Sequence, residues 1–191
     1  MRWRVTYLLT ALPLAALTCA PAHADALGPD WYAGFSGDLT WLPHTDTGYG
    51  GNVDLGYRFW PSDFGNARME GEIGYHRADN NNLAADTHYY TYMGNLYYDF
   101  NIFHNSPSET RIMPYVGVGL GDTTAHFSQG VSGNAFAYQL MAGLTLTPAS
   151  TPNIDWSLGW RYQGSDHVDN SAGLSERLKA NSLELGVRFH F

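Results

Sequence analysis

The chain has 191 residues, of which 15% are charged and 15% aromatic, with 21 glycines, one cysteine and a formal net charge of −8. Average soluble domains carry about 25% charged residues and about 7% glycine, so this composition excludes the usual surface of a cytosolic enzyme. The negative charge argues against a nucleic-acid binder, which needs basic patches to neutralise phosphates. The mean hydropathy of −0.29 excludes a helical membrane protein.

The N-terminal segment has the three-part layout of a secretory signal peptide. Two arginines precede an apolar run over 5–17, and Ala22 and Ala24 place small residues at the −3 and −1 positions of a cleavage site. The apolar run is shorter than the roughly 20 residues that a membrane-spanning helix needs. We therefore predict that 1–24 is removed on export, together with the only cysteine, and that 25–191 forms the mature domain, which has no disulfide.

Beyond the signal segment, apolar and polar residues alternate with a period of two. Such alternation is typical of strands that have one apolar and one polar face. Eight segments share it: 31–41, 52–60, 68–76, 90–100, 115–121, 136–146, 155–163 and 182–191. No stretch shows a helical period or a second domain, and the linkers rich in Gly, Asn, Ser and Pro are typical of turns and loops.

The two faces of these strands differ in a way that predicts their surroundings. One face carries glycines and charged residues, whereas the other has no charge and gathers aromatic residues toward strand ends, as with Trp31 and Trp41. Aromatic girdles around an apolar band are typical of a transmembrane β-barrel, and a bilayer requires the sheet to close on itself. The predicted fold is an all-β, eight-stranded antiparallel up-and-down transmembrane β-barrel.

The charged residues of the polar face are the candidate site residues. An eight-stranded barrel has an interior just wide enough for side chains to fill it, so we expect opposite charges to pair there and close the lumen. The predicted structural network consists of Asp54, Arg58, Glu70, Glu72, Asp99, Arg161, Glu184 and Arg188. The many glycines on the same face leave open the alternative of a narrow solute or ion channel.

Strand parity predicts how the barrel is oriented. If both ends of the domain lie in the periplasm, alternate connections face the cell exterior and should be the longer set. The predicted outer loops are 42–51, 77–89, 122–135 and 164–181, and the predicted inner turns are 61–67, 101–113 and 147–153.

Several segments resemble the eight-stranded outer-membrane β-barrel superfamily of opacity-type surface proteins and the membrane domain of OmpA. They are Asn95–Phe100, Pro114–Gly121, Phe136–Gln139, Trp160–Tyr162 and Leu185–Phe191. The resemblance implies an outer-membrane location and a role among adhesins, surface antigens and small pores. It also implies that Phe191, with Phe189 two residues before it, forms the signal that the outer-membrane assembly machinery recognises.

Candidate catalytic residues are sparse. Barrel enzymes that deacylate lipid A resemble this architecture and use a His-x-Ser-Asn pair on a late strand with a downstream glutamate. Here that region reads His167-Val168-Asp169-Asn170 before Glu184, with aspartate in place of the serine, and His126-Phe127-Ser128 lies one loop earlier. A serine nucleophile needs a base and an orienting group within reach. We therefore predict no enzymatic activity, with a lipid A modifying enzyme as the further alternative.

The remaining polar residues predict partners rather than cofactors. The histidines have no spacing typical of a metal site, so we expect no metal and no cofactor. The predicted partners are outer-membrane lipid and lipopolysaccharide, the assembly machinery, and a surface ligand contacted through the outer loops. The sequence favours a structural or surface-interaction role of the adhesin or antigen kind.

Overall fold

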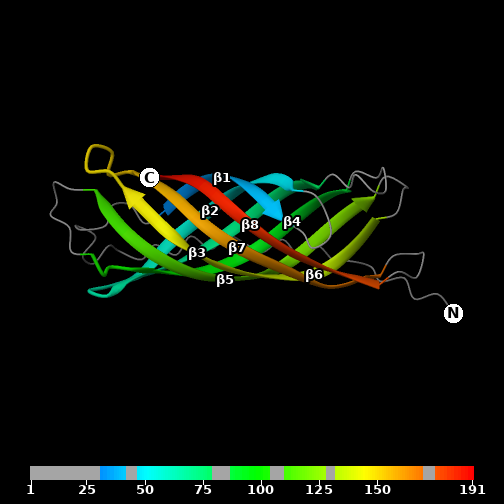
Figure 1. Ribbon diagram of the computed structural model, residues 1–191. Coiled ribbons are helices and arrows are strands. Elements are labelled where there is room, and N and C mark those ends of the chain that lie inside the picture. Colours follow the sequence, from blue (N-terminus) through cyan, green and yellow to red (C-terminus); the bar gives the residue numbers. More distant parts are fainter. Residues whose placement is uncertain (1–30, 42–46, 79–86, 104–109, 128–131, 170–174) are drawn as a thin grey trace.

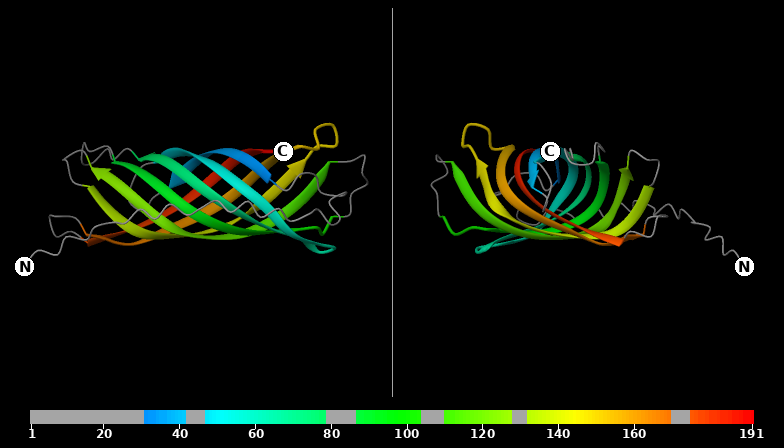
Figure 2. Two further views of the ribbon diagram at one scale, coloured as in Figure 1. Left: turned by 180° about the vertical axis from the view of Figure 1, so that it is seen from behind. Right: turned by 45° about the vertical axis from the view of Figure 1, so that its right-hand side comes forward.

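The computed structural model describes residues 31–41, 47–78, 87–103, 110–127, 132–169 and 175–191. Within them, antiparallel strands pair in chain order and β1 pairs with β8, so that the sheet closes into a barrel (Figures 1 and 2). The strands are β1 (Trp31–Trp41), β2 (Gly48–Ser62), β3 (Gly65–Ala78), β4 (Thr87–Phe100), β5 (Arg111–Phe127), β6 (Ser132–Thr147), β7 (Ile154–Asp169) and β8 (Ser175–His190). The predicted fold class is confirmed.

The predicted signal peptide, 1–24, lies outside the described residues. Among the described residues, no helix has the length and apolar character needed to cross a membrane.

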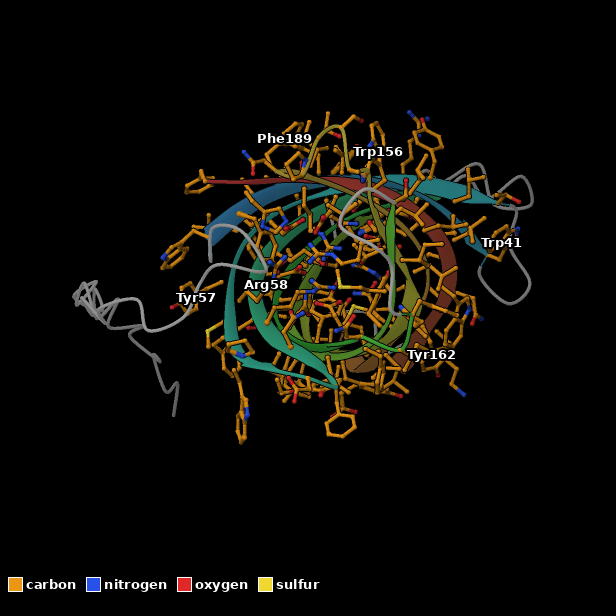
Figure 3. All side chains as sticks on the ribbon, turned by 90° about the vertical axis from the view of Figure 1, so that its left-hand side faces the viewer. Trp41, Tyr57, Arg58, Trp156, Tyr162 and Phe189 are labelled. Atoms are coloured by element: carbon orange, nitrogen blue, oxygen red, sulfur yellow. The ribbon has the colours of Figure 1, made fainter. Side chains whose placement is uncertain are left out.

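The two-residue alternation separates an apolar outer wall from a polar interior. On β1, Phe35 and Leu39 are 54% and 51% exposed, whereas Asp38 and Thr40, on the other face, are buried. Figure 3 shows the same contrast between chain neighbours, because Arg58 lies inside the ring of strands and Tyr57 outside it. The predicted assignment of polar residues to the lumen therefore holds for these strands.

Strand pairing continues beyond the segments that the alternation marks. The bounds predicted for the outer loops are wrong, because the strands leave only 42–47, 79–86, 128–131 and 170–174 between them at that end. Among the described side chains of β5, the last large apolar one on the outer wall is Leu120, yet the ladder with β6 runs on to His126. The apolar pattern stops where lipid contact would stop, whereas backbone pairing needs no apolar side chain. We call this end of the barrel the outer end.

The opposite end, which we call the inner end, holds the connections 63–64, 101–110 and 148–153. These replace the longer turns that the sequence predicted, again because the strands extend further. The register of β2 against β3 shifts between Phe59 and Pro61, and the residue between them, Trp60, has a φ of 57°. A bulge of this kind bends its strand near a barrel rim, and the pairing resumes with Pro61 opposite Asn66.

Inward-facing glycines make room for tyrosine rings. A Cβ atom at Gly117 would meet the ring of Tyr97, and one at Gly56 would meet the ring of Tyr32. Both tyrosines are buried inside the barrel. At these positions the interior has no space for a larger residue, because the cross-strand tyrosine already fills it.

This packing predicts that the interior tolerates no added volume beside Tyr97. Gly117→Val should lower the free energy of unfolding by about 1–3 kcal/mol, the usual cost of overpacking a filled core. The neighbouring Val118 is 53% exposed on the outer wall, so Val118→Leu should change stability by less than about 0.5 kcal/mol. Urea unfolding in lipid vesicles, followed by tryptophan fluorescence, measures both. Equal stability of Gly117→Val and the unmodified protein would contradict the packing argument.

Candidate functional site

The centre of the lumen is organised around Arg161 of β7. Its Nη1 and Nη2 atoms lie 2.6 and 2.9 Å from the two carboxylate oxygens of Glu72 on β3, and Nη2 also lies 2.7 Å from Glu184 on β8. The amide of Asn95 donates to Glu72 at 3.1 Å, and Gln139 accepts from Arg161 at 3.3 Å. One guanidinium thus joins opposite walls of the barrel, and the bidentate geometry with Glu72 gives strong, directional bonds.

A second cluster lies around Arg68 of β3. Its Nε donates to Asp99 at 2.9 Å, its Nη1 contacts Glu70, and the hydroxyl of Tyr32 donates to the same Glu70 at 2.7 Å. The guanidinium carbon lies 3.8 Å from the ring centroid of Tyr97. A cation over an aromatic face is favourable where water is excluded, so this arginine is stabilised by both carboxylates and a ring.

A third cluster connects strands toward the inner end. Asp155 of β7 lies 2.8 Å from Nε2 of His190 and 3.7 Å from Arg58, and it accepts a hydrogen bond from Thr147 at 2.6 Å. Arg188 of β8 approaches it at 4.0 Å. The carboxylate of Asp155 is thus surrounded by donors from β2, β6 and β8.

Toward the outer end the interior is closed by a smaller group. Nδ1 of His76 lies 3.3 Å from Asp38, and the imidazole stacks on Tyr89 with a centroid separation of 4.7 Å. Thr40 donates to Asp38 at 2.6 Å and lies 2.8 Å from Ser182 across the closing β1–β8 seam. Polar contacts therefore continue along the lumen from this group to the inner end.

A small cavity lies between these clusters. It measures about 20 Å³ and is lined by Asp54, Arg68, Glu70, Glu72, Glu184 and Arg188 among others. A void of this size holds about one water molecule. Asp54 stands apart from the ion pairs, since its Oδ1 makes no hydrogen bond within the part of the chain that the structure describes.

The predicted network residues all face the interior, but they combine differently from the simple pairing that the sequence suggested. Arg161 contacts Glu72 and Glu184, and Arg188 lies 3.8 Å from Glu70. Arg68 and Asp155 also belong to the network, although the set predicted from the sequence does not include them. These two residues are the partners of Asp99 and Arg58, respectively. The sequence contains the information needed to include them, because Arg68 and Asp155 begin alternating segments and occupy positions on the polar face.

The candidate catalytic residues of the late segment do not gather around Glu184. Glu184 is paired across the sheet with Gly159, whereas His167 lies eight residues further along β7 and pairs with Arg177. At about 3.3 Å per residue, this places the backbone of His167 roughly 25 Å from Glu184. Glu184 instead contacts Arg161. The side chains of His126, His167 and Asp169, as well as Ser128 and Asn170, lie outside the described part.

Two further predictions concern metals and the end of β8. In the described ranges, no group of three or more His, Cys, Asp or Glu residues is placed to hold a metal ion. Phe189 and Phe191 are 43% and 66% exposed on the outer wall. The backbone amide of Phe191 donates to the carbonyl of Trp31 at 2.9 Å, so this residue extends the closing seam.

Comparison with known proteins places this geometry among membrane barrels. The family model of the outer membrane protein beta-barrel domain matches residues 10–191. A comparison with curated protein sequences gives no significant match.

Solved structures give the same architecture. Neisserial surface protein A matches with a TM-score of 0.63 and 23% identity, over 84% of this chain and 97% of its own. The outer membrane enzyme PagL matches at 0.51 and 16%, over 83% and 99%. The attachment invasion locus protein Ail of Yersinia pestis matches at 0.45 and 17%, over 84% and 97%. At these identities the likeness to the first two structures shows the fold alone.

The central cluster yields a stability prediction. Arg161→Met leaves Glu72 and Glu184 buried without their shared cation, which should cost about 3–5 kcal/mol of unfolding free energy. Adding Glu72→Gln and Glu184→Gln to the same chain should restore most of the loss, because no uncompensated charge remains. Guanidinium unfolding in detergent micelles measures the series. A triple variant no more stable than Arg161→Met would show that the ion pairs are not the source of the effect.

Proposed function

This chain belongs to the outer membrane protein beta-barrel domain family, and we propose that it acts in the outer membrane as a sealed barrel with a structural or surface-interaction role. The observation that carries the proposal is the filled lumen, in which the central cavity measures about 20 Å³. A barrel that conducts nothing must act through its surfaces. The outer connections and the outer rim of the wall are then the parts available to a ligand, as in an adhesin or surface antigen.

The channel alternative is opposed by the way the ion pairs cross the lumen. Arg161 of β7 reaches across the lumen to Glu72 of β3 and also contacts Glu184 on the adjacent β8. Arg68 fills the space along one wall, because it pairs with Glu70 on its own strand and with Asp99 on the neighbouring β4. An ion entering this space would have to separate buried charges from their partners, which costs several kcal/mol. This barrier supports a closed interior over a narrow pore.

The sealed interior predicts that the barrel does not conduct ions across a bilayer. In planar lipid bilayers the unmodified protein should give no conductance steps, whereas a variant carrying Arg161→Ala, Glu72→Ala and Glu184→Ala should give small steps because the central crossing is removed. If the unmodified protein gave discrete conductance steps equal in size to those of the variant, the sealed barrel would be wrong and the channel hypothesis would be supported.

The outer rim offers charges suited to lipopolysaccharide, the lipid of the outer leaflet. Lys179, the only lysine of the chain, is exposed on β8. Arg77 lies at the outer end of β3. It is two residues beyond the exposed Tyr75 and is on the same face of the strand. Basic side chains at headgroup level attract anionic lipid headgroups, and aromatic neighbours favour the same interface. We propose that this rim contacts the phosphates of lipopolysaccharide.

The rim proposal predicts a modest, local effect of charge removal. Lys179→Gln should weaken binding of purified lipopolysaccharide to the detergent-solubilised barrel about fivefold, since one basic residue near a charged lipid surface contributes about 1 kcal/mol. Arg111→Gln removes an arginine at the inner end of β5 and serves as the matched control. Isothermal titration at two salt concentrations measures both. Equal losses in the two variants would mean that net charge, not the outer rim, governs binding.

The proposal also covers the end of β8 and the candidate catalytic residues. We propose that Phe189 and Phe191 serve as the assembly signal, which their outward position on the last strand supports, and that the assembly machinery reads them before the barrel closes. We propose no catalytic role, because Glu184 is held by Arg161 rather than lying near His167. The printed name of PagL describes an enzyme, but that likeness extends to the fold only.

A further inference from the structure

The outer wall contains a groove where two glycines face each other. Gly71 of β3 and Gly94 of β4 are cross-strand partners, and both are exposed on the lipid-facing side. They form the floor of a groove of about 580 Å³. Its walls are the outward apolar side chains of four strands: Leu55, Met69, Leu96, Val118 and Leu120. Elsewhere on β3 and β4 the same face carries large residues such as Ile73 and Tyr92.

Packing does not require glycine at either position. A Cβ atom at Gly71 would meet nothing within 4 Å, and one at Gly94 would meet only the carbonyl oxygen of Leu120, at 3.8 Å. Among the described residues, the glycine with a positive φ is Gly65, so backbone conformation does not require it either. At Gly117, by contrast, a Cβ atom would meet the ring of Tyr97, so packing does require glycine there. The groove is therefore a feature of the surface and not a consequence of how the barrel is filled.

The position of the groove indicates what fills it. One end lies at Trp31 and Tyr57, whose rings are in contact with centroids 5.0 Å apart. Trp31 begins β1 at the inner end of the barrel, and paired aromatic rings at a strand end sit at the headgroup level of a bilayer. The groove extends from there to Val118 and Leu120, near the middle of β5. It thus runs from an interface toward the midplane, which is the path of one acyl chain.

We propose that this groove binds one acyl chain of a zwitterionic phospholipid from the inner leaflet, with its headgroup beside Trp31 and Tyr57. The volume lies within the roughly 300–1,000 Å³ of small-molecule sites. The groove is continuous with the lipid-facing wall, and its lining supplies no cation that would select an anionic headgroup. An acyl chain can follow a narrow groove along its whole length, and lipid is the medium that surrounds this wall. The choice of leaflet rests on the orientation of the barrel inferred from strand parity.

The test fills the groove and measures retained lipid. Gly71→Leu and Gly94→Leu, singly and together, place side chains on the floor, and Gly37→Leu is the matched control. Gly37 is also exposed on the outer wall, its Cβ would meet only a backbone oxygen at 3.9 Å, and it does not line the groove. Native mass spectrometry in detergent with added phosphatidylethanolamine counts the bound lipids. Heat-dependent gel mobility verifies that each variant is folded.

We expect the unmodified protein and Gly37→Leu to retain one phosphatidylethanolamine, and the double leucine variant to retain about tenfold less. If the leucine variants fail to fold, Gly71→Ala, whose methyl group meets nothing, should still lower retention. Equal retention in all folded variants would overturn the proposal. A dimer of the unmodified protein that the groove variants abolish would also overturn it, because the occupant would then be a second copy.

Discussion

Closure of the sheet is the constraint on which the rest of the molecule depends. In hydrocarbon an unpaired backbone amide or carbonyl has no water to bind, so the β1–β8 seam must be paired along its length, as it is from Tyr32 to Trp41. Closing eight strands also sets the width of the lumen, which leaves room for side chains and little else. Every second residue of each strand must therefore be accommodated inside, and buried polar groups must find partners within that space.

This constraint explains why the lumen cations are arginines. Arg161 reaches two carboxylates on different strands with one planar group, and Arg68 does so while lying over a tyrosine ring. An ammonium group is a compact, strongly hydrated point charge, whereas a guanidinium is more weakly hydrated and presents several donors in fixed directions. The only lysine, Lys179, is exposed at the outer end. The more strongly hydrated ammonium group thus lies at the water-exposed rim, whereas the described cations of the central lumen are guanidinium groups.

The sequence predicts the faces of the strands well because alternation is a local property. It predicts strand ends poorly, since the ladder of β5 continues past Leu120 through Asp122, Thr123 and Thr124, which break the alternation of apolar and polar residues. The ion pairs inside the lumen are even harder to predict from the sequence. Arg161 and Glu72 are on strands that are not neighbours, so their contact depends on register and barrel curvature. Asp54 follows the same parity as its neighbours, yet it lies beside the central cavity and outside the ion pairs.

Some of the glycines that make the composition unusual determine how the interior of the barrel is packed. Inside, a glycine accepts a tyrosine ring from across the sheet, as Gly56 does for Tyr32 and Gly117 for Tyr97. Those rings fill volume that ion pairs cannot, and the hydroxyl of Tyr32 joins the polar network through Glu70. Charge pairing alone would leave gaps large enough for water, and water would weaken the pairs by raising the local dielectric. The seal of the lumen therefore depends on glycine and tyrosine acting together as much as on the charges that they surround.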